Sequence, residues 1–448
     1  MYYNNNDKDN SNTTNNTNTF HVRDDYVTHR RRLRDALADY LLPQGFPDSV
    51  APQYAKYMGW RGVQYFFGGA MSVFTTRSLL GAVGVANRHS GEAAAAINWV
   101  VKDGAGRMGR FLFARWGREL DCELKQFRLG GDILMETGAA LELSTALAPR
   151  LFLPLACTAN LAKNLAAVAA SSTRAPIYRT FAKENNLADV TAKGESVANL
   201  ADVLGTICGI ILAKANLPVV PTFACLSVGY LLASRREVDS VELPYLNRAR
   251  LSYAARAYLR QGVVPGPAEA NREEPLLPWS DPTAGHIVLG ATVEEACGGP
   301  EELRQALQAF KGKKYALTYR PETKKVYVML REGAGSEGTL QGALLAHSVL
   351  QYIEQGTHGV GVGLGGKKQV EVDGRGGGGS GSGAVGKMKR SLLQQQYSNI
   401  GSLYKGAMDF ISTSGGELIS DFEKQSKGQG WRLPLTMLNP SETRLHVL

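Results

Sequence analysis

One long stretch of the chain, from about Leu42 to Tyr258, is rich in apolar and small residues yet carries charged residues at intervals. Within it, Ala215–Ser234 has no charged residue over twenty positions, about the length of helix that crosses the hydrocarbon of a membrane. Other apolar runs, 62–76, 151–162 and 203–213, each stop at an Arg or Lys. Abundant Gly, Ala, Ser and Thr are typical of helices that pack closely inside a membrane. The pattern predicts a mainly α-helical, multi-helix bundle and favours a membrane-embedded one, with a large soluble bundle as the alternative.

Six charged residues inside this block follow one another at spacings of three or four positions. They are Arg118, Asp121, Lys125, Arg128, Asp132 and Glu136. On one helix this spacing places them along a single face, where opposite charges pair across each turn. A solvated stripe on an amphipathic helix is one explanation. Isolated charges are costly in lipid, so in a membrane-embedded bundle the same stripe would face the interior and line a polar cavity.

A second polar set follows the first. Its members are Asn160, Lys163, Asn164, Arg174, Asn185, Asn186, Asp189 and Lys193. A weak echo at offsets of 67 or 68 residues relates Asp121 to Asp189 and Gly138 to Gly205, which suggests an internal duplication of the kind common in transporters. The second set can supply hydrogen bonds to an anionic ligand. Helix capping by Asn185 or Asn186 is the plainer explanation.

The pattern changes after the apolar block. Prolines cluster in a predicted linker at 262–285, and 286–355 reads as a small α+β module in the order β-α-β-β-α. We expect its strands at 286–290, 314–319 and 325–331, its helices at 301–310 and 337–354, and a turn at Pro321. A Gly-rich linker at 356–390 leads to a helical C-terminal tail at 391–448. Before the helical domain, taken as 29–261, residues 1–28 form an Asn/Thr-rich leader predicted to be disordered.

Charge and cysteine content narrow the class of protein. The net charge of +9 suits an anionic membrane surface, and no basic stretch is interleaved with aromatics, so nucleic acid is not an expected partner. The five cysteines lack the spacing of a metal site or a disulfide framework, so we predict no metal and no cofactor. The leader lacks the character of an organellar transit peptide or a secretory signal.

Enzyme motifs are absent or incomplete. The segment Gly381–Lys387 approaches a phosphate-binding loop, but Met388 stands where Ser or Thr would hold magnesium. The glycines of 359–366 lack the strand–turn–helix setting of a dinucleotide site. We therefore predict no catalytic residue and a protein that is not an enzyme.

Three fragments of the block carry a family resemblance: 42–50 (LPQGFPDSV), 120–129 (LDCELKQFRL) and 185–193 (NNLADVTAK). With these fragments the chain resembles the Root UVB Sensitive family. The resemblance implies a mostly helical, membrane-associated protein with no established enzymatic activity. It also implies roles in vitamin B6 homeostasis and ultraviolet-B responses, association with another family member, and a plastid location for some relatives.

Two functional hypotheses follow. In the first, a membrane protein acts as a transporter-like or scaffold component in small-molecule homeostasis. Pyridoxal phosphate, as an anion, would then contact Lys125, Arg128, Lys163 and Arg174. In the second, a soluble or peripheral module docks a protein partner through the charged stripe, and charge reversal at Asp121 or Asp132 would disrupt that docking.

Overall fold

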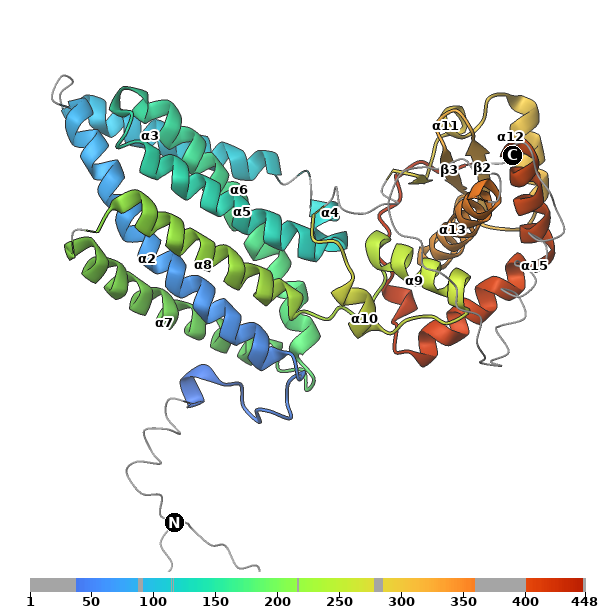
Figure 1. The fold of residues 1–448 in the computed structure, drawn as a ribbon, viewed down its shortest axis with the longest axis horizontal. Helices are drawn as coiled ribbons and strands as arrows, with labels where there is room; N and C mark the ends of the chain where they lie inside the picture. Colours follow the sequence, from blue (N-terminus) through green and yellow to red (C-terminus); the bar gives the residue numbers. More distant parts are fainter. Residues whose placement is uncertain are drawn as a thin grey trace, which may run out of the picture.

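The computed structural model describes residues 38–87, 92–113, 115, 117–215, 217–277, 285–358 and 400–445. The predicted leader and nearly all of the predicted Gly-rich linker lie outside the described residues. Two bodies stand side by side in Figure 1: a helical domain (residues 38–245) and a C-terminal domain (residues 246–445).

Long helices build the helical domain, as the sequence predicts. They are α2 (Tyr54–Asn87), α3 (Glu92–Phe113), α4 (Gly117–Cys122), α5 (Leu124–Ser144), α6 (Phe152–Phe181, preceded by the 3-10 turn η2, Pro149–Leu151), α7 (Leu187–Lys214) and α8 (Val219–Asp239). Figure 1 shows α3 and α7 at opposite edges of the bundle, with α5 and α8 between them.

The packing divides these helices into two similar halves. Helix α6 packs against both α3 and α5, just as α2 packs against both α7 and α8. The start of α2 lies beside the end of α6, where Ala51 N donates to Phe181 O at 2.9 Å, so these two helices run in opposite directions. In chain order, α2–α3–α5 and α6–α7–α8 therefore pack in a similar pattern: the first helix of each half lies against the last two helices of the other, and α5 also contacts α8. Such a pattern resembles an internal repeat.

The repeat differs from the one read in the sequence. The offset of 67 or 68 residues relates Gly138 of α5 to Gly205 of α7, whereas the packing makes α8 the counterpart of α5. Both glycines nevertheless have a similar role, because each lets two helices pack closely. A Cβ at Gly205 would lie 1.9 Å from Phe66 O, and one at Gly138 would lie 2.7 Å from the Lys163 side chain.

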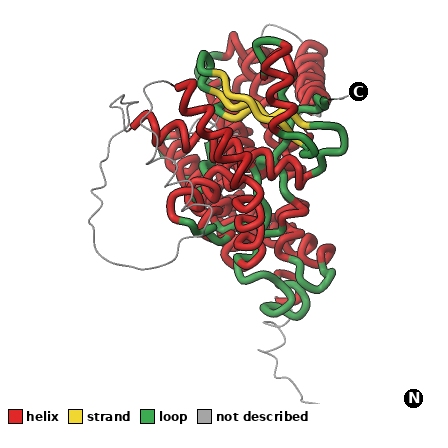
Figure 2. Tube along the Cα trace, turned by 90° about the vertical axis from the view of Figure 1, so that its right-hand side faces the viewer, coloured by secondary structure: helices red, strands yellow, loops and turns green. Residues whose placement is uncertain are grey.

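The predicted α+β module is confirmed in its elements. It contains β1 (Ile287–Leu289), α11 (Val293–Ala296), α12 (Pro300–Ala309), β2 (Tyr315–Arg320), β3 (Lys325–Leu330) and α13 (Ser336–His358). The sheet has the order β1-β3-β2; β1 runs parallel to β3 and β2 antiparallel to it. Figure 2 shows this small sheet among helices.

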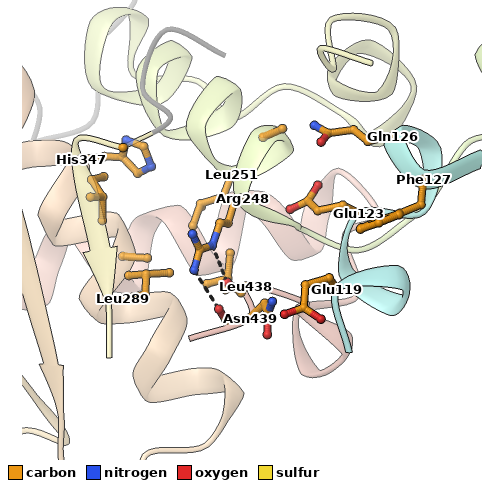
Figure 3. Close-up of a pocket in the computed structure, with 14 residues that line it drawn as sticks. Glu119, Glu123, Gln126, Phe127, Arg248, Leu251, Leu289, His347, Leu438 and Asn439 are labelled. Carbon is orange, nitrogen blue, oxygen red and sulfur yellow. Dashed lines mark hydrogen bonds between the residues drawn. The ribbon is translucent and has the colours of Figure 1, made fainter. Parts of the chain in front are cut away.

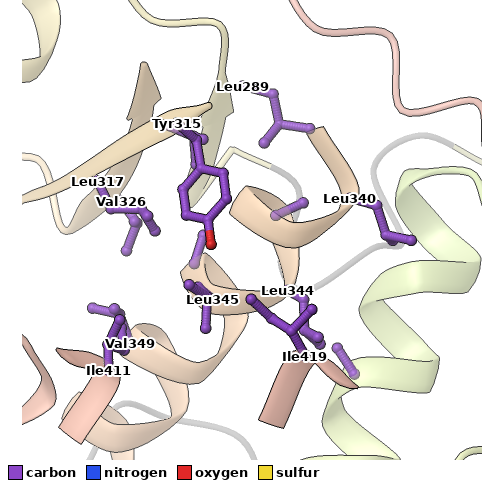
Figure 4. Close-up of a cluster of buried hydrophobic side chains, with 14 of the residues drawn as sticks. Leu289, Tyr315, Leu317, Val326, Leu340, Leu344, Leu345, Val349, Ile411 and Ile419 are labelled. Atoms are coloured by element: carbon purple, nitrogen blue, oxygen red, sulfur yellow. The ribbon is translucent and has the colours of Figure 1, made fainter. Parts of the chain in front are cut away.

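Segments from outside the module complete the C-terminal domain. Helices α9 (Arg248–Gln261) and α15 (Ile400–Gly428), with the 3-10 turn η4 (Leu433–Leu435), share one apolar core with the sheet and α13. Figure 4 shows Tyr315 and Leu317 of β2 facing Leu344 and Leu345 of α13, with Ile411 of α15 behind. The segment predicted as a linker contains α10 (Pro267–Arg272) and the buried Asn271 and Glu274, so it is packed at the joint between the domains.

Candidate functional site: a buried charge network

The predicted stripe is interrupted and mostly buried. A break at Glu123 separates α4 from α5, so the six residues do not share one helix. Lys125, Arg128, Asp132 and Glu136 lie on α5, and all four are buried. Asp121 is exposed on α4, and Arg118 belongs to α4 with a side chain outside the described residues. The solvated-stripe explanation is therefore wrong for the part on α5.

Arg128 and Asp132 form the centre of a network at the meeting of α5 and α8. The Arg128 guanidinium lies 3.1 Å from Asp132 Oδ1 and 3.2 Å from Glu237 Oε1 on α8. Asp132 also accepts hydrogen bonds from Ser234 Oγ at 2.6 Å and Tyr230 OH at 3.3 Å. Each formal charge thus has an opposite charge or a hydroxyl as partner, as a buried ion requires.

The network continues through α2 to the far side of the bundle. Arg61 Nη1 lies 3.7 Å from Glu237 Oε1, and Arg61 Nη2 lies 3.4 Å from Glu195 Oε1 on α7. Arg174 of α6 also pairs with Glu195, at 3.0 Å. Arg61, which is 1% exposed, and Glu237, which is fully buried, were not among the residues predicted from sequence. Arg61 is a single charge within an apolar part of α2, whereas Glu237 stands among Arg235, Arg236 and Asp239 and has no such sequence signal.

A cavity of about 270 Å³ opens beside this network. Its charged lining residues are Arg128, Asp132, Glu136, Lys163 and Asp202. Ser227 Oγ donates to Glu136 at 2.6 Å, and Lys163 pairs with Glu142 one turn beyond the cavity. The walls come from α2, α5, α6, α7 and α8, and so from both halves of the repeat.

The predicted phosphate contacts do not converge. Arg128 and Lys163 line the cavity, whereas Lys125 and Arg174 lie outside its lining. All four cations already pair with carboxylates: Arg128 with Asp132 and Glu237, Lys163 with Glu142, Lys125 with Glu274, and Arg174 with Glu195. The arrangement is therefore not a cluster of unpaired cations for a phosphate.

Other members of the second polar set make contacts within the protein. Asn160 Nδ2 donates to Lys102 O at 2.8 Å and links α6 to α3. Asp189 accepts from Gln44 N at 2.7 Å and lies 3.9 Å from Lys193. Asn185 adopts a left-handed conformation at φ 55°.

The predicted capping hydrogen bond at the start of α7 is not present. Asn186 stands at the N-cap of α7, but its side chain makes no capping hydrogen bond. Its Nδ2 donates instead to Ser49 O at 3.1 Å.

A second buried cluster joins the two domains. Glu274 accepts from Arg250 Nη1 at 2.8 Å and lies 3.6 Å from Lys125 Nζ. Asn247 also donates to Glu274, at 2.8 Å. Burial raises the pKa of Tyr245 to about 12 although its ring lies 5.0 Å from the Arg250 guanidinium. This cluster fixes α5 against the C-terminal domain.

Comparisons with known proteins identify the family of this chain. A "Vitamin B6 photo-protection and homoeostasis domain" matches residues 27–262, and a "Root UVB sensitive protein, C-terminal" domain matches residues 263–363. The chain is 42% identical to Protein root UVB sensitive 6 of Arabidopsis thaliana, over 92% of this chain and 78% of that protein. The chain belongs to the Root UVB Sensitive family.

Other Root UVB Sensitive proteins are similar over shorter spans. Protein root UVB sensitive 2, chloroplastic, of Arabidopsis thaliana is 33% identical over 72% of this chain and 75% of its own length. RUS family member 1 of Dictyostelium discoideum is 34% identical over 54% of this chain and 48% of its own length. No solved structure matches the chain. The charge network lies wholly within the part that matches the vitamin B6 domain of this family.

Proposed function

We propose that the helical domain is embedded in a membrane and binds a small polar molecule between its two halves, as a transporter-like component of vitamin B6 homeostasis. The observation that carries the proposal is the distribution of side chains: charges are buried at the α5–α8 contact, while large apolar side chains are exposed on several helices. In lipid an apolar surface has no cost, whereas inward charges mark a ligand path.

Two helices support membrane insertion. Within the described residues, Pro149–Phe181 and Leu187–Lys214 are long and apolar enough to cross a membrane, and only 28% and 17% of their apolar windows are buried. The charge-free run predicted as a span, 215–234, is not among them, since α8 begins only at Val219. Exposed α7 residues such as Leu204, Ile207 and Ile211 would then contact lipid.

The cavity favours an unphosphorylated vitamer over pyridoxal phosphate. Its volume of about 270 Å³ is near the lower end for small-molecule sites. Its cations are paired, and three carboxylates line it against two cations. A pyridine ring with hydroxyl and hydroxymethyl groups suits such alternating partners better than a dianion does. The proposed role is non-enzymatic, because binding and movement of a ligand need only the cavity and the repeat.

Alkaline carbonate extraction of the tagged full-length protein tests insertion. We expect retention in the membrane pellet. Release into the supernatant would overturn the membrane proposal. It would favour a peripheral module that docks a protein partner, for example a second member of the family. Asp121 is exposed and suits a charge-reversal test of that docking, whereas Asp132 is 3% exposed and its reversal would disturb the fold instead.

Calorimetric titration of the purified chain with pyridoxine and with pyridoxal phosphate tests the ligand. We expect pyridoxine to bind more tightly, and Glu136→Gln to weaken it roughly tenfold through loss of a charged partner. Thr137→Ala, one position along α5 and facing outward, is the matched control. Equal binding by wild type and Glu136→Gln would place the ligand elsewhere. The plastid is the proposed compartment, since one similar relative is named chloroplastic.

A further inference from the structure

A second cavity, of about 340 Å³, lies at the junction of the two domains. Its walls come from α4, the start of α5, α9, β1, α13 and the chain after η4, which lie far apart in the sequence. Figure 3 shows Arg248 between Leu289 and His347 on one side and Glu119 on the other. None of its lining residues belongs to the charge network or to the cavity described above.

One carboxylate oxygen of the half-buried Glu119 has no partner among the described residues. Its Oε2 is buried and has no hydrogen-bond partner among the described residues, and no ion pair joins it to Arg248 within 4.0 Å. A buried carboxylate oxygen is costly to leave unpaired. A donor group of a bound molecule, such as an ammonium, would satisfy Glu119 Oε2 in the cavity.

The guanidinium of Arg248 supplies the opposite charge. Its Nε donates to Leu438 O at 2.9 Å and its Nη2 to Asn439 O at 2.8 Å. These carbonyl oxygens hold the guanidinium in place without neutralising its charge, and the remaining N–H groups suit a carboxylate. Beyond this polar end, Leu251, Leu289 and Ala343 form an apolar wall.

We propose that the junction cavity binds a small zwitterion with an apolar body, of the α-amino acid type. The ammonium group pairs with Glu119, the carboxylate with Arg248, and the side chain lies on the apolar wall. The site is independent of membrane insertion and of the vitamin B6 proposal. It stands on the first turn of α5, immediately before Arg128, so its occupant contacts the helix that forms the centre of the charge network.

Calorimetric titration and thermal unfolding of the full-length chain, purified in mild detergent, test the proposal. L-leucine and L-phenylalanine are compared with phenethylamine, which lacks the carboxylate, and hydrocinnamate, which lacks the ammonium group. We expect at least one amino acid to bind, and both single-charge analogues to bind at least tenfold more weakly.

Glu119→Gln and Arg248→Gln should each weaken amino-acid binding tenfold or more, while their unfolding temperatures without ligand stay close to wild type. Glu294→Gln, on an exposed residue of the same domain, is the matched control and should change nothing. The proposal is overturned if neither amino acid binds, if phenethylamine binds as tightly as phenylalanine, or if both variants retain wild-type affinity. If one variant does not fold, the amino-acid affinity of the other variant tests the proposal.

Discussion

The helical domain and the joint bury charged residues, whereas the rest of the C-terminal domain that the structure describes does not. In the helical domain and its joint, Lys102, Lys125, Arg128, Asp132 and Glu237 are among the buried charged residues. In the described residues after Glu274, no Asp, Glu, Lys or Arg is buried, and the core around Tyr315, Leu344 and Phe422 is apolar. Among the residues that the structure describes, all but two of the exposed large hydrophobic ones, Val263 and Leu435, lie between positions 40 and 232.

The contrast is the basis for proposing that a membrane surrounds the helical domain. The C-terminal domain has one large apolar core, and burial of apolar side chains supplies the main driving force for its folding. The helical domain exposes apolar residues over several helices, well beyond the scattered ones found on ordinary surfaces. It relies on close glycine contacts and internal ion pairs, which remain effective where the outside is apolar.

Removal of one buried charge should produce the largest effect. Glu237→Ala leaves Arg61 and Arg128 without a shared counter-charge, and loss of one partner of a buried pair costs about 3–5 kcal/mol. Thermal unfolding in detergent should show a large loss of stability. Glu184→Ala, an exposed carboxylate between α6 and α7, is the control and should stay within about 0.5 kcal/mol of wild type. Equal effects of the two variants would contradict the network's role.

In the C-terminal domain, truncation of a buried apolar side chain is the matching test of what stabilises the fold. Leu344→Ala on α13 removes a side chain that is 1% exposed, and such changes cost about 2–5 kcal/mol. Denaturant unfolding should show the loss in the transition of the C-terminal domain. Leu200→Ala on α7, where the side chain is 45% exposed, should have a much smaller effect on stability. Similar losses at both sites would mean that α7 is covered by protein.

A charge on the outer face of α7 discriminates lipid from water. Ile207 is 50% exposed. Ile207→Lys should cost about 2.5–3.5 kcal/mol in lipid and reduce the fraction retained after carbonate extraction. In water the same change should alter stability by less than about 0.5 kcal/mol. Ile207→Val is the control, and full retention of the lysine variant would contradict lipid contact.

The smallest effect is expected at an exposed ion pair of the helical domain. Arg235 and Asp239 lie 3.8 Å apart with side chains 65% and 44% exposed. Asp239→Asn should change the unfolding free energy by less than about 0.5 kcal/mol, since solvent screens the pair. A loss comparable to that of Glu237→Ala would show that burial is not what distinguishes the network.

The sequence predicted secondary structure better than it predicted the site. The α+β order, the turn at Pro321 and the helical block are local patterns, and the structure confirms them. The inward position of Lys125, Arg128, Asp132 and Glu136 was one of two open explanations, because spacing fixes a helical face but not its direction. Arg61 and Glu237 were missed because their contacts join helices far apart in sequence. The linker prediction followed proline content, which does not reveal that Asn271 holds Leu243 through a pair of hydrogen bonds.

The exchange of central helices between the two halves has a consequence for synthesis and folding. Of the long helices described in the helical domain, α2 leaves the ribosome first, yet its main packing partners are α7 and α8, which end only at Asp239. The helical domain therefore cannot close until nearly all of its chain has left the ribosome. Contacts of such long sequence separation slow folding, because a large loop must be ordered before they form. Until then the glycine face of α2, with Gly69 and its neighbours, stays without its native partner and would depend on lipid or a chaperone for cover.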